Sequence, residues 1–151
     1  MEFKQAHRLG NLHVFGTRVV FGKCAELAAQ GIPVTALTLG QPDFDTPQYI
    51  IDACKKALDE GKTRYTDGSG IQELKEAVCQ KLEKENGLHY TPSEISVTTG
   101  VAQGMFVALL STLNPGDEVL VPDPGWANYV GLMMQVGAVP VPVRMKEENG
   151  F

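Results

Sequence analysis

The stretch ISVTTGVAQGMFVALLSTLNPGDEVLVPDPGWANYVGLMMQVGAVPVPV, residues 95–143, decides the fold. Three runs rich in Val, Leu and Ile predict strands, at 95–99, 118–122 and 138–143. The mostly apolar segments between them, 101–113 and 126–136, predict helices. Strands that alternate with helices at this spacing form parallel sheets with right-handed crossovers. We therefore expect an α/β fold of alternating βαβ units with a parallel or mixed sheet.

Two helices and a short extended piece are expected between residues 17 and 61. The first helix covers 17–30, where apolar residues recur at helical spacing, and the extended piece follows at 34–39. Thr46 is a good N-cap and Pro47 suits the first helical position. The second helix therefore opens at Pro47 and stops at Gly61.

A third helix is expected after the loop at 62–70. Ser69 and Gln72 have the spacing of a capping box, in which two side chains bond reciprocally to the backbone of a helix start. The helix ends at Gly87. One of its faces is predicted to be buried, namely Ile71, Leu74, Val78 and Leu82.

The composition is that of a folded globular protein. The 151 residues include 43% hydrophobic and 21% charged side chains, which excludes intrinsic disorder. A formal net charge of −5 gives no reason to expect a nucleic-acid partner, because phosphate backbones select clustered Lys and Arg. No apolar run reaches the roughly 20 residues of a membrane helix, and the first residues do not form a secretory signal.

Neither the cysteines nor the histidines predict a site. Cys24, Cys54 and Cys79 are odd in number, widely spaced and without a CxxC pair, so we expect reduced thiols on buried helix faces and a cytoplasmic location. The three histidines are scattered, so no metal site is expected. The polar ending KEENGF and the open edges of the predicted sheet lead us to expect the front part of a longer protein.

The turn at 99–103, Thr-Gly-Val-Ala-Gln, is the first candidate site. A predicted strand runs there through Gly100 directly into a helix, whose free N–H groups and partial positive charge favour a phosphate. Ligands of open α/β sheets bind beyond the carboxyl ends of the strands, where this turn lies. The helix contains no Asp or Glu, which a bound anion explains, although a buried helix also avoids charge.

The second candidate site is the turn Pro-Asp-Pro-Gly-Trp at 122–126, beyond the next strand. Its Trp126 is the only tryptophan and offers a flat face to an aromatic ligand, although packing over the domain edge also explains it. Both turns are expected on one edge of the sheet. Together they would hold a phosphorylated aromatic ring.

Two loops are further candidates. The glycine of GQPDF, Gly40, would let a ligand approach the backbone, although an ordinary turn explains it as well. The loop KTRYTDGSG at 62–70 mixes hydrogen-bond donors with glycines but follows no strand, so it is not a dinucleotide fingerprint. The sequence has no Walker A, GxSxG or HExxH motif.

Five segments resemble, in order and spacing, those of the class I and II aminotransferases, fold type I enzymes that use pyridoxal 5′-phosphate. They are LTLGQPDFDTP, GKTRYTDGSGIQEL, ISVTTGVAQG, NPGDEVLVPDPGWANY and GAVPVPV. The resemblance runs from about Gly31 to Phe151, and we expect residues 1–31 before it to form an N-terminal arm and helix. The resemblance implies that 32–151 is the incomplete, N-terminal part of the large cofactor-binding domain.

The resemblance implies roles toward the cofactor. The backbone amides of Gly100, Val101 and Ala102 would hold its phosphate. Gln103 belongs to the same motif. Trp126 would stack on the pyridine ring, a position that is Trp or Tyr in the family.

The resemblance also implies contacts with a second subunit and with the substrate. Tyr65 would reach the cofactor phosphate of the neighbouring subunit, which implies a homodimer. Gly40 would line the substrate pocket near the amino-acid carboxylate. Asn128 would lie at the substrate too, and Tyr129 is a further candidate.

The implied activity is transfer of an amino group from an L-amino acid to a 2-oxo acid. The family's Schiff-base lysine has no match within these 151 residues, so we expect this chain to be inactive by itself. A C–S lyase or another fold type I enzyme stays an alternative, because the missing groups select the reaction. A cofactor-binding module of a transcription regulator and an unrelated phosphate-binding α/β domain are two more.

Overall fold

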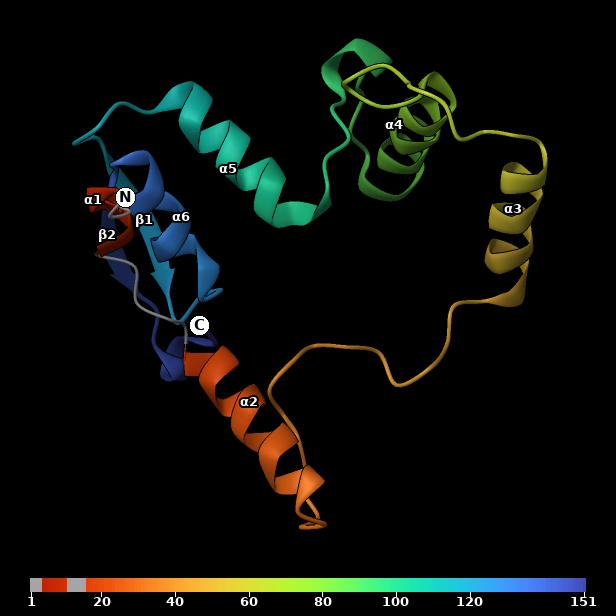
Figure 1. The fold of residues 1–151 in the computed structure, drawn as a ribbon. Helices are drawn as coiled ribbons and strands as arrows, with labels where there is room; N and C mark the ends of the chain where they lie inside the picture. Colours follow the sequence, from red (N-terminus) through yellow and green to blue (C-terminus); the bar gives the residue numbers. More distant parts are fainter. Residues whose placement is uncertain (1–3, 11–15) are drawn as a thin grey trace. The chain divides into compact units, whose positions relative to one another are not determined.

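Two structural units make up this chain in the computed structural model, which describes residues 4–10 and 16–151 (Figure 1). One unit joins Met1–Gly40 to Thr99–Phe151, and the other is Gln41–Thr98. Both candidate turns that follow predicted strands belong to the first unit, whereas the loop at 62–70 belongs to the second.

A parallel βαβ arrangement forms the centre of the first unit. Strand β1 (Glu118–Asp123) leads through helix α6 (Asn128–Val136) to strand β2 (Val139–Arg144). The strands pair in parallel, from Glu118 opposite Val139 to Asp123 opposite Arg144. Helix α5 (Gly100–Thr112) precedes β1 in the chain.

These four elements confirm the predictions for residues 100–144. The helix expected at 101–113 and the strands expected at 118–122 and 138–143 lie within one residue of their predicted bounds. Helix α6 begins two residues later than the predicted 126, because the turn continues to Ala127. Gly137 ends α6 in the left-handed region, with φ of 84°.

Five buried apolar side chains form the core of this unit. They are Leu109, Val121, Met133, Val136 and Ala138. Helix α6 packs on α5 and on both strands, so α6 is the central element of the core. Burial of apolar surface stabilises this packing by about 25 cal/mol per Å². The core thereby fixes the turns at the start of α5 and at the end of β1.

The predicted strand at 95–99 is wrong, and the extended piece expected at 34–39 belongs to no strand of the described residues. In the part of the chain that the structure describes, the sheet has two strands, β1 and β2. A strand persists only beside a partner that offers a hydrogen-bond ladder. The backbone N–H of Val97 donates instead to the carbonyl of Ser69, at 2.8 Å, and Ser69 lies in a turn.

Of the residues that the structure describes before residue 40, two stretches form helices in the first unit. Helix α1 (His7–Gly10) is a single turn, and helix α2 (Gly16–Ala29) matches the helix predicted at 17–30. Gly31 follows α2 with a φ of 76°, the left-handed conformation that glycine commonly adopts after a helix end. Near the other end of this unit, residues Glu147–Asn149 form a short 3-10 turn.

Helices α3 (Gln48–Asp59) and α4 (Gln72–Asn86) form the second unit, with a 3-10 turn at Pro92–Glu94. Their predicted ends are confirmed, since Gly61 and Gly87 have φ values of 71° and 66°. Their predicted N-caps are wrong. Pro47 is the N-cap of α3 and Ile71 that of α4, and neither start carries a side-chain cap from Thr46 or Ser69.

The predicted buried face of α4 is also wrong. Ile71 and Leu74 are exposed, and Val78 and Leu82 are half-buried. Among the described elements, only the turn at Pro92–Glu94 packs on α4. The helical spacing of these side chains is therefore present, but the described residues provide no layer that covers them.

Two observations bear on the cysteine and membrane expectations. Cys24, Cys54 and Cys79 are free thiols, of which Cys54 is exposed and the others half-buried, so their expected burial is wrong. Among residues 4–10 and 16–151, no helix combines the length and the apolar character needed to cross a bilayer.

Candidate functional site

The start of α5 has the features of a phosphate cradle. Gly100 opens the helix with a φ of 77°, a conformation that favours glycine. The first N–H groups of a helix have no partner carbonyl within it, and they carry partial positive charge. No acidic residue lies in the first turn of α5, and a Cβ built on Gly100 meets no heavy atom within 4 Å. There is space at this turn for an anion.

Gln103 stabilises this turn by a local contact. Its Oε1 accepts a hydrogen bond from the backbone N–H of Thr99 at 2.5 Å. Val101 is 70% exposed, and Ala102 and Gln103 are exposed as well. Gln103 therefore acts on the turn through its carbonyl oxygen, while Val101 and Ala102 present their backbone at the open helix end.

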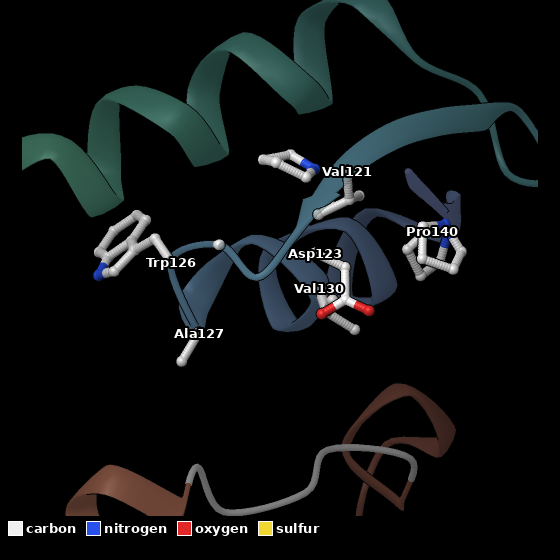
Figure 2. Close-up of a pocket in the computed structure, with 9 residues that line it drawn as sticks. Val121, Asp123, Trp126, Ala127, Val130 and Pro140 are labelled. Atoms are coloured by element: carbon white, nitrogen blue, oxygen red, sulfur yellow. The ribbon is translucent and has the colours of Figure 1, made fainter. Parts of the chain in front are cut away.

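A hollow of about 400 Å³ lies beside the second candidate turn. Figure 2 shows the side chains that line it, with Trp126 at one end of the view and Pro140 at the other. The lining comes from β1, the turn that follows it, α6 and β2: Val121, Pro122, Asp123, Gly125, Trp126, Ala127, Val130, Pro140 and Pro142. Most of this lining is apolar, which suits the face of an aromatic ligand.

The orientation of Trp126 is set by its neighbours. Its ring meets that of Tyr129 edge to face, with centroids 5.3 Å apart and an angle of 84°. The backbone N–H of Tyr129 donates to the carbonyl of Trp126 at 3.0 Å. Trp126 is still 40% exposed, so part of the indole is available to a ligand. Such an edge-to-face pair contributes about 0.5–1.5 kcal/mol beyond burial.

The turn before Trp126 is tightly packed. A Cβ added to Gly125 would collide with the carbonyl oxygen of Pro122, so only glycine fits there. The backbone N–H of Met145, just after β2, donates to the carbonyl of Asp123 at 2.8 Å. The indole therefore projects from a turn that is fixed at both sides.

The structure brings together some of the predicted site residues and separates others. Residues 100–103 share one helix turn, and Trp126 and Asn128 lie two residues apart at the start of α6. The lining of the hollow includes Trp126 but none of residues 100–103. A single cradle formed by both turns thus stays a prediction.

The predicted substrate residues are accessible. Asn128 is half-buried at the first position of α6. Gly40 is exposed, and a Cβ built on it meets nothing within 4 Å, so the local backbone alone does not require glycine there.

Tyr65 lies in the other structural unit and is fully exposed, at 109% of its reference area. Two residues later, Asp67 accepts hydrogen bonds from Ser69. These bonds, first from the Ser69 hydroxyl and then from its backbone N–H, hold the pKa of Asp67 below its ordinary value of 3.8. In the same unit, the backbone N–H and hydroxyl of Thr91 lower the pKa of Glu94 in the same way.

The second candidate turn already included Asp123, but sequence reasoning missed the side chains that line the hollow from β2, Pro140 and Pro142. The sequence did carry a signal for the two prolines. Pro140 and Pro142 lie two residues apart in a predicted strand, and such residues face the same side of the sheet. Pro142 stands opposite Val121 in the sheet register, and both line the hollow. Asp123 places a carboxylate among apolar walls, and it ends β1 at the edge where ligands are expected.

Comparison with known proteins gives a family match. A sequence profile described as aminotransferase class I and II matches residues 32–151. The aspartate/prephenate aminotransferase of Cereibacter sphaeroides is 50% identical over 135 residues, which cover 89% of this chain and 34% of that protein. The probable aspartate/prephenate aminotransferase of Aquifex aeolicus is 44% identical over 146 residues, 97% of this chain and 37% of that protein.

A solved structure is similar to this chain as well. It is that of aspartate aminotransferase from Thermus thermophilus with maleate, at 40% identity and a TM-score of 0.94. The match covers 99% of this chain and 39% of that one. The chain thus spans little more than a third of the length of these relatives. Its fold is the α/β fold of the matching part.

Proposed function

Since this chain belongs to the class I and II aminotransferase family, we propose that the whole protein is a pyridoxal-phosphate-dependent aminotransferase. It transfers an amino group from an L-amino acid to a 2-oxo acid. The observation that carries the proposal lies within one structural unit. There, a helix start that suits a phosphate and a partly exposed indole beside a hollow follow one another along the chain.

The residues at the two turns fit the cofactor. The open space at Gly100 and the absence of acid from the first turn of α5 suit a phosphate on the amides of Val101 and Ala102. Gln103 keeps that turn in place through Thr99. The exposed part of Trp126, at an apolar hollow, suits the pyridine ring.

The remaining predicted roles belong to the same proposal. Tyr65, fully exposed on its loop, reaches the cofactor phosphate of a neighbouring subunit, so the active protein is a homodimer. Gly40 and Asn128 lie at the substrate, where a glycine leaves room for its carboxylate. Residues 32–151 form the N-terminal part of the cofactor-binding domain. We place the protein in the cytoplasm, which its free thiols support.

This chain holds and orients the cofactor. When bound, pyridoxal phosphate accepts the electron pair that is left when a bond to the substrate α-carbon breaks. Among the described residues, no lysine lines the hollow beside Trp126. Since the family's Schiff-base lysine has no match within these 151 residues, we propose that the lysine that moves the α-proton lies elsewhere in the whole protein, and that this chain by itself is inactive.

The names of the relatives narrow the reaction. Those compared above are aspartate or aspartate/prephenate aminotransferases, which favours amino-group transfer over the C–S lyase alternative. We propose an acidic amino acid such as aspartate as the amino donor and a 2-oxo acid such as prephenate as an acceptor.

The test uses the full-length polypeptide that carries these residues. Titration of its cofactor-free form with pyridoxal phosphate should give a saturable change in visible absorbance. Aspartate and a 2-oxo acid should then yield the amino acid that corresponds to that 2-oxo acid. A C–S lyase would give no such product and would instead release a thiol and ammonia from a sulfur-containing amino acid supplied in a parallel assay. Saturable cofactor binding without amino-group transfer contradicts the proposed reaction, and absence of cofactor binding contradicts the proposal as a whole.

A further inference from the structure

The loop that carries Tyr65 is internally bonded although it is exposed. One Asp67 carboxylate oxygen, Oδ1, accepts hydrogen bonds from the backbone N–H of Ser69 at 2.7 Å and from its hydroxyl at 2.5 Å. The ammonium of Lys75, on α4, donates to the Ser69 hydroxyl oxygen at 3.0 Å. The chain Asp67–Ser69–Lys75 thus ties the loop to the first turn of the following helix.

The same loop is held against a second segment of its unit. The carbonyl of Ser69 accepts the backbone N–H of Val97 at 2.8 Å. Gly70 has a φ of 108°, and a Cβ there would lie 2.6 Å from Cγ2 of Val97. The backbone of the loop therefore abuts Val97, and any displacement of Ser69 breaks this contact.

Tyr65 stands in contrast to these restraints. It lies two residues before Asp67 and is fully exposed, and no described residue of its unit packs on its ring. An exposed group on a fixed backbone loses less conformational freedom when it binds than one on a free loop. The restraint and the exposure together suit a side chain that is presented to a partner molecule.

We propose that Asp67 is a positioning residue, which fixes the loop so that the Tyr65 hydroxyl meets the cofactor phosphate of the neighbouring subunit. This inference rests on the proposed function and adds a residue that acts through Tyr65. The lowered pKa of Asp67, caused by its bonds from Ser69, keeps its carboxylate an acceptor across the neutral range. Asp67 itself touches neither cofactor nor substrate.

A double-mutant cycle in the full-length dimer tests this inference. The readout is the Kd for pyridoxal phosphate, measured on the wild type, Asp67→Ala, Tyr65→Phe and the double variant. Asp67→Ala should raise Kd about five- to tenfold, the net effect of one typical hydrogen bond that is lost. If Asp67 acts through Tyr65, the same change in the Tyr65→Phe background has little further effect. Asp67→Asn, which keeps an oxygen acceptor for the Ser69 N–H, should restore most of the affinity.

Glu94 provides a matched control. Its carboxylate accepts the backbone N–H of Thr91 at 2.8 Å and the Thr91 hydroxyl at 2.7 Å, so Glu94→Ala removes the same charge and the same kinds of bond. It lies in the same unit but outside the Tyr65 loop. Glu94→Ala should leave the cofactor Kd unchanged. Hydrogen exchange of the cofactor-free protein gives a second readout: Asp67→Ala should speed exchange at 63–70, and Glu94→Ala should not.

Each outcome decides the inference. Additive effects of Asp67→Ala and Tyr65→Phe on Kd overturn it, as does an unchanged Kd in Asp67→Ala while Tyr65→Phe weakens binding. In both cases the proposed function stands. If Tyr65→Phe itself leaves Kd unchanged, the proposed role of Tyr65 fails, and the inference fails with it.

Discussion

The backbone N–H of Thr99 donates a hydrogen bond to Oε1 of Gln103 across the first turn of α5. The sequence predicted Gln103 as a ligand residue, and the structure gives it a contact with the helix itself. This contact holds the turn in which Gly100, Val101 and Ala102 follow one another. Substitutions can separate these two roles. The free energy of unfolding reports the contact with the helix turn, and the cofactor Kd reports the predicted role toward the ligand.

Gln103→Leu removes the acceptor for the Thr99 N–H. The free energy of unfolding should fall by about 1 kcal/mol, the net worth of a typical hydrogen bond. Gln103→Glu keeps an oxygen acceptor but adds a negative charge next to the proposed phosphate, so its stability should stay near wild type while the cofactor Kd rises. Urea unfolding and absorbance titration of the full-length protein measure the two effects. Equal stability of the Leu variant and wild type would show that the contact is unimportant.

Gly100→Ala tests the backbone at the same turn. A Cβ there has free space, but a φ of 77° is unfavourable for alanine by about 1–2 kcal/mol. The stability should fall by that amount, and cofactor affinity should fall too because the amides shift. Gly22→Ala is the control, since Gly22 lies inside α2 without a positive φ and should gain about 0.5–1 kcal/mol. A Gly100→Ala variant as stable as wild type contradicts the role of the turn.

Gly40→Ala separates function from folding in the opposite way. A Cβ added to Gly40 meets open space, and the backbone φ there is not left-handed. The free energy of unfolding should therefore change by less than about 0.5 kcal/mol. If Gly40 lines the substrate pocket, the added methyl group raises KM for the amino acid while the cofactor Kd stays the same. Steady-state kinetics and denaturant unfolding distinguish these effects. An unchanged KM removes Gly40 from the proposed site.

The lowered pKa values of Asp67 and Glu94 predict acid sensitivity of the second structural unit. A carboxylate whose pKa is depressed on folding adds stability that is fully present above its ordinary value. That stability is lost as the pH falls below the ordinary values of 3.8 for Asp67 and 4.5 for Glu94. The urea concentration at the unfolding midpoint should therefore decrease once the pH is below about 4.5. It should decrease less steeply in an Asp67→Asn, Glu94→Gln double variant. Identical pH profiles for the two proteins contradict the assignment.

Local signals predicted most of the elements. Glycines past helix ends predicted the stops at Gly61 and Gly87, because glycine has no Cβ and adopts the left-handed conformation there without a steric penalty. The Val- and Leu-rich runs marked β1 and β2, and the helix between them followed from its apolar spacing. These features depend on residues within a few positions of each other.

Features that depend on distant partners were not predictable in the same way. Residues 95–99 have strand composition, yet no strand of the described residues pairs with them. Ser69 has capping-box spacing, yet its hydroxyl bonds to the side chains of Asp67 and Lys75 rather than to the backbone of the helix start. The hollow needed the register of two strands, which places Pro142 opposite Val121. Composition alone does not encode that register.

The central claim is that the indole of Trp126 stacks on the cofactor ring. The most direct measurement is the Kd for pyridoxal phosphate of full-length Trp126→Ala, Trp126→Phe and Tyr129→Leu proteins, beside their free energies of unfolding. Loss of the stacked ring should raise Kd about tenfold in Trp126→Ala, equivalent to roughly 1.4 kcal/mol, and much less in Trp126→Phe. Tyr129→Leu, which removes only the edge-to-face partner at 5.3 Å, should affect stability more than Kd. If Trp126→Ala lowers stability but binds the cofactor as tightly as wild type, the indole only packs against Tyr129 and the account is contradicted.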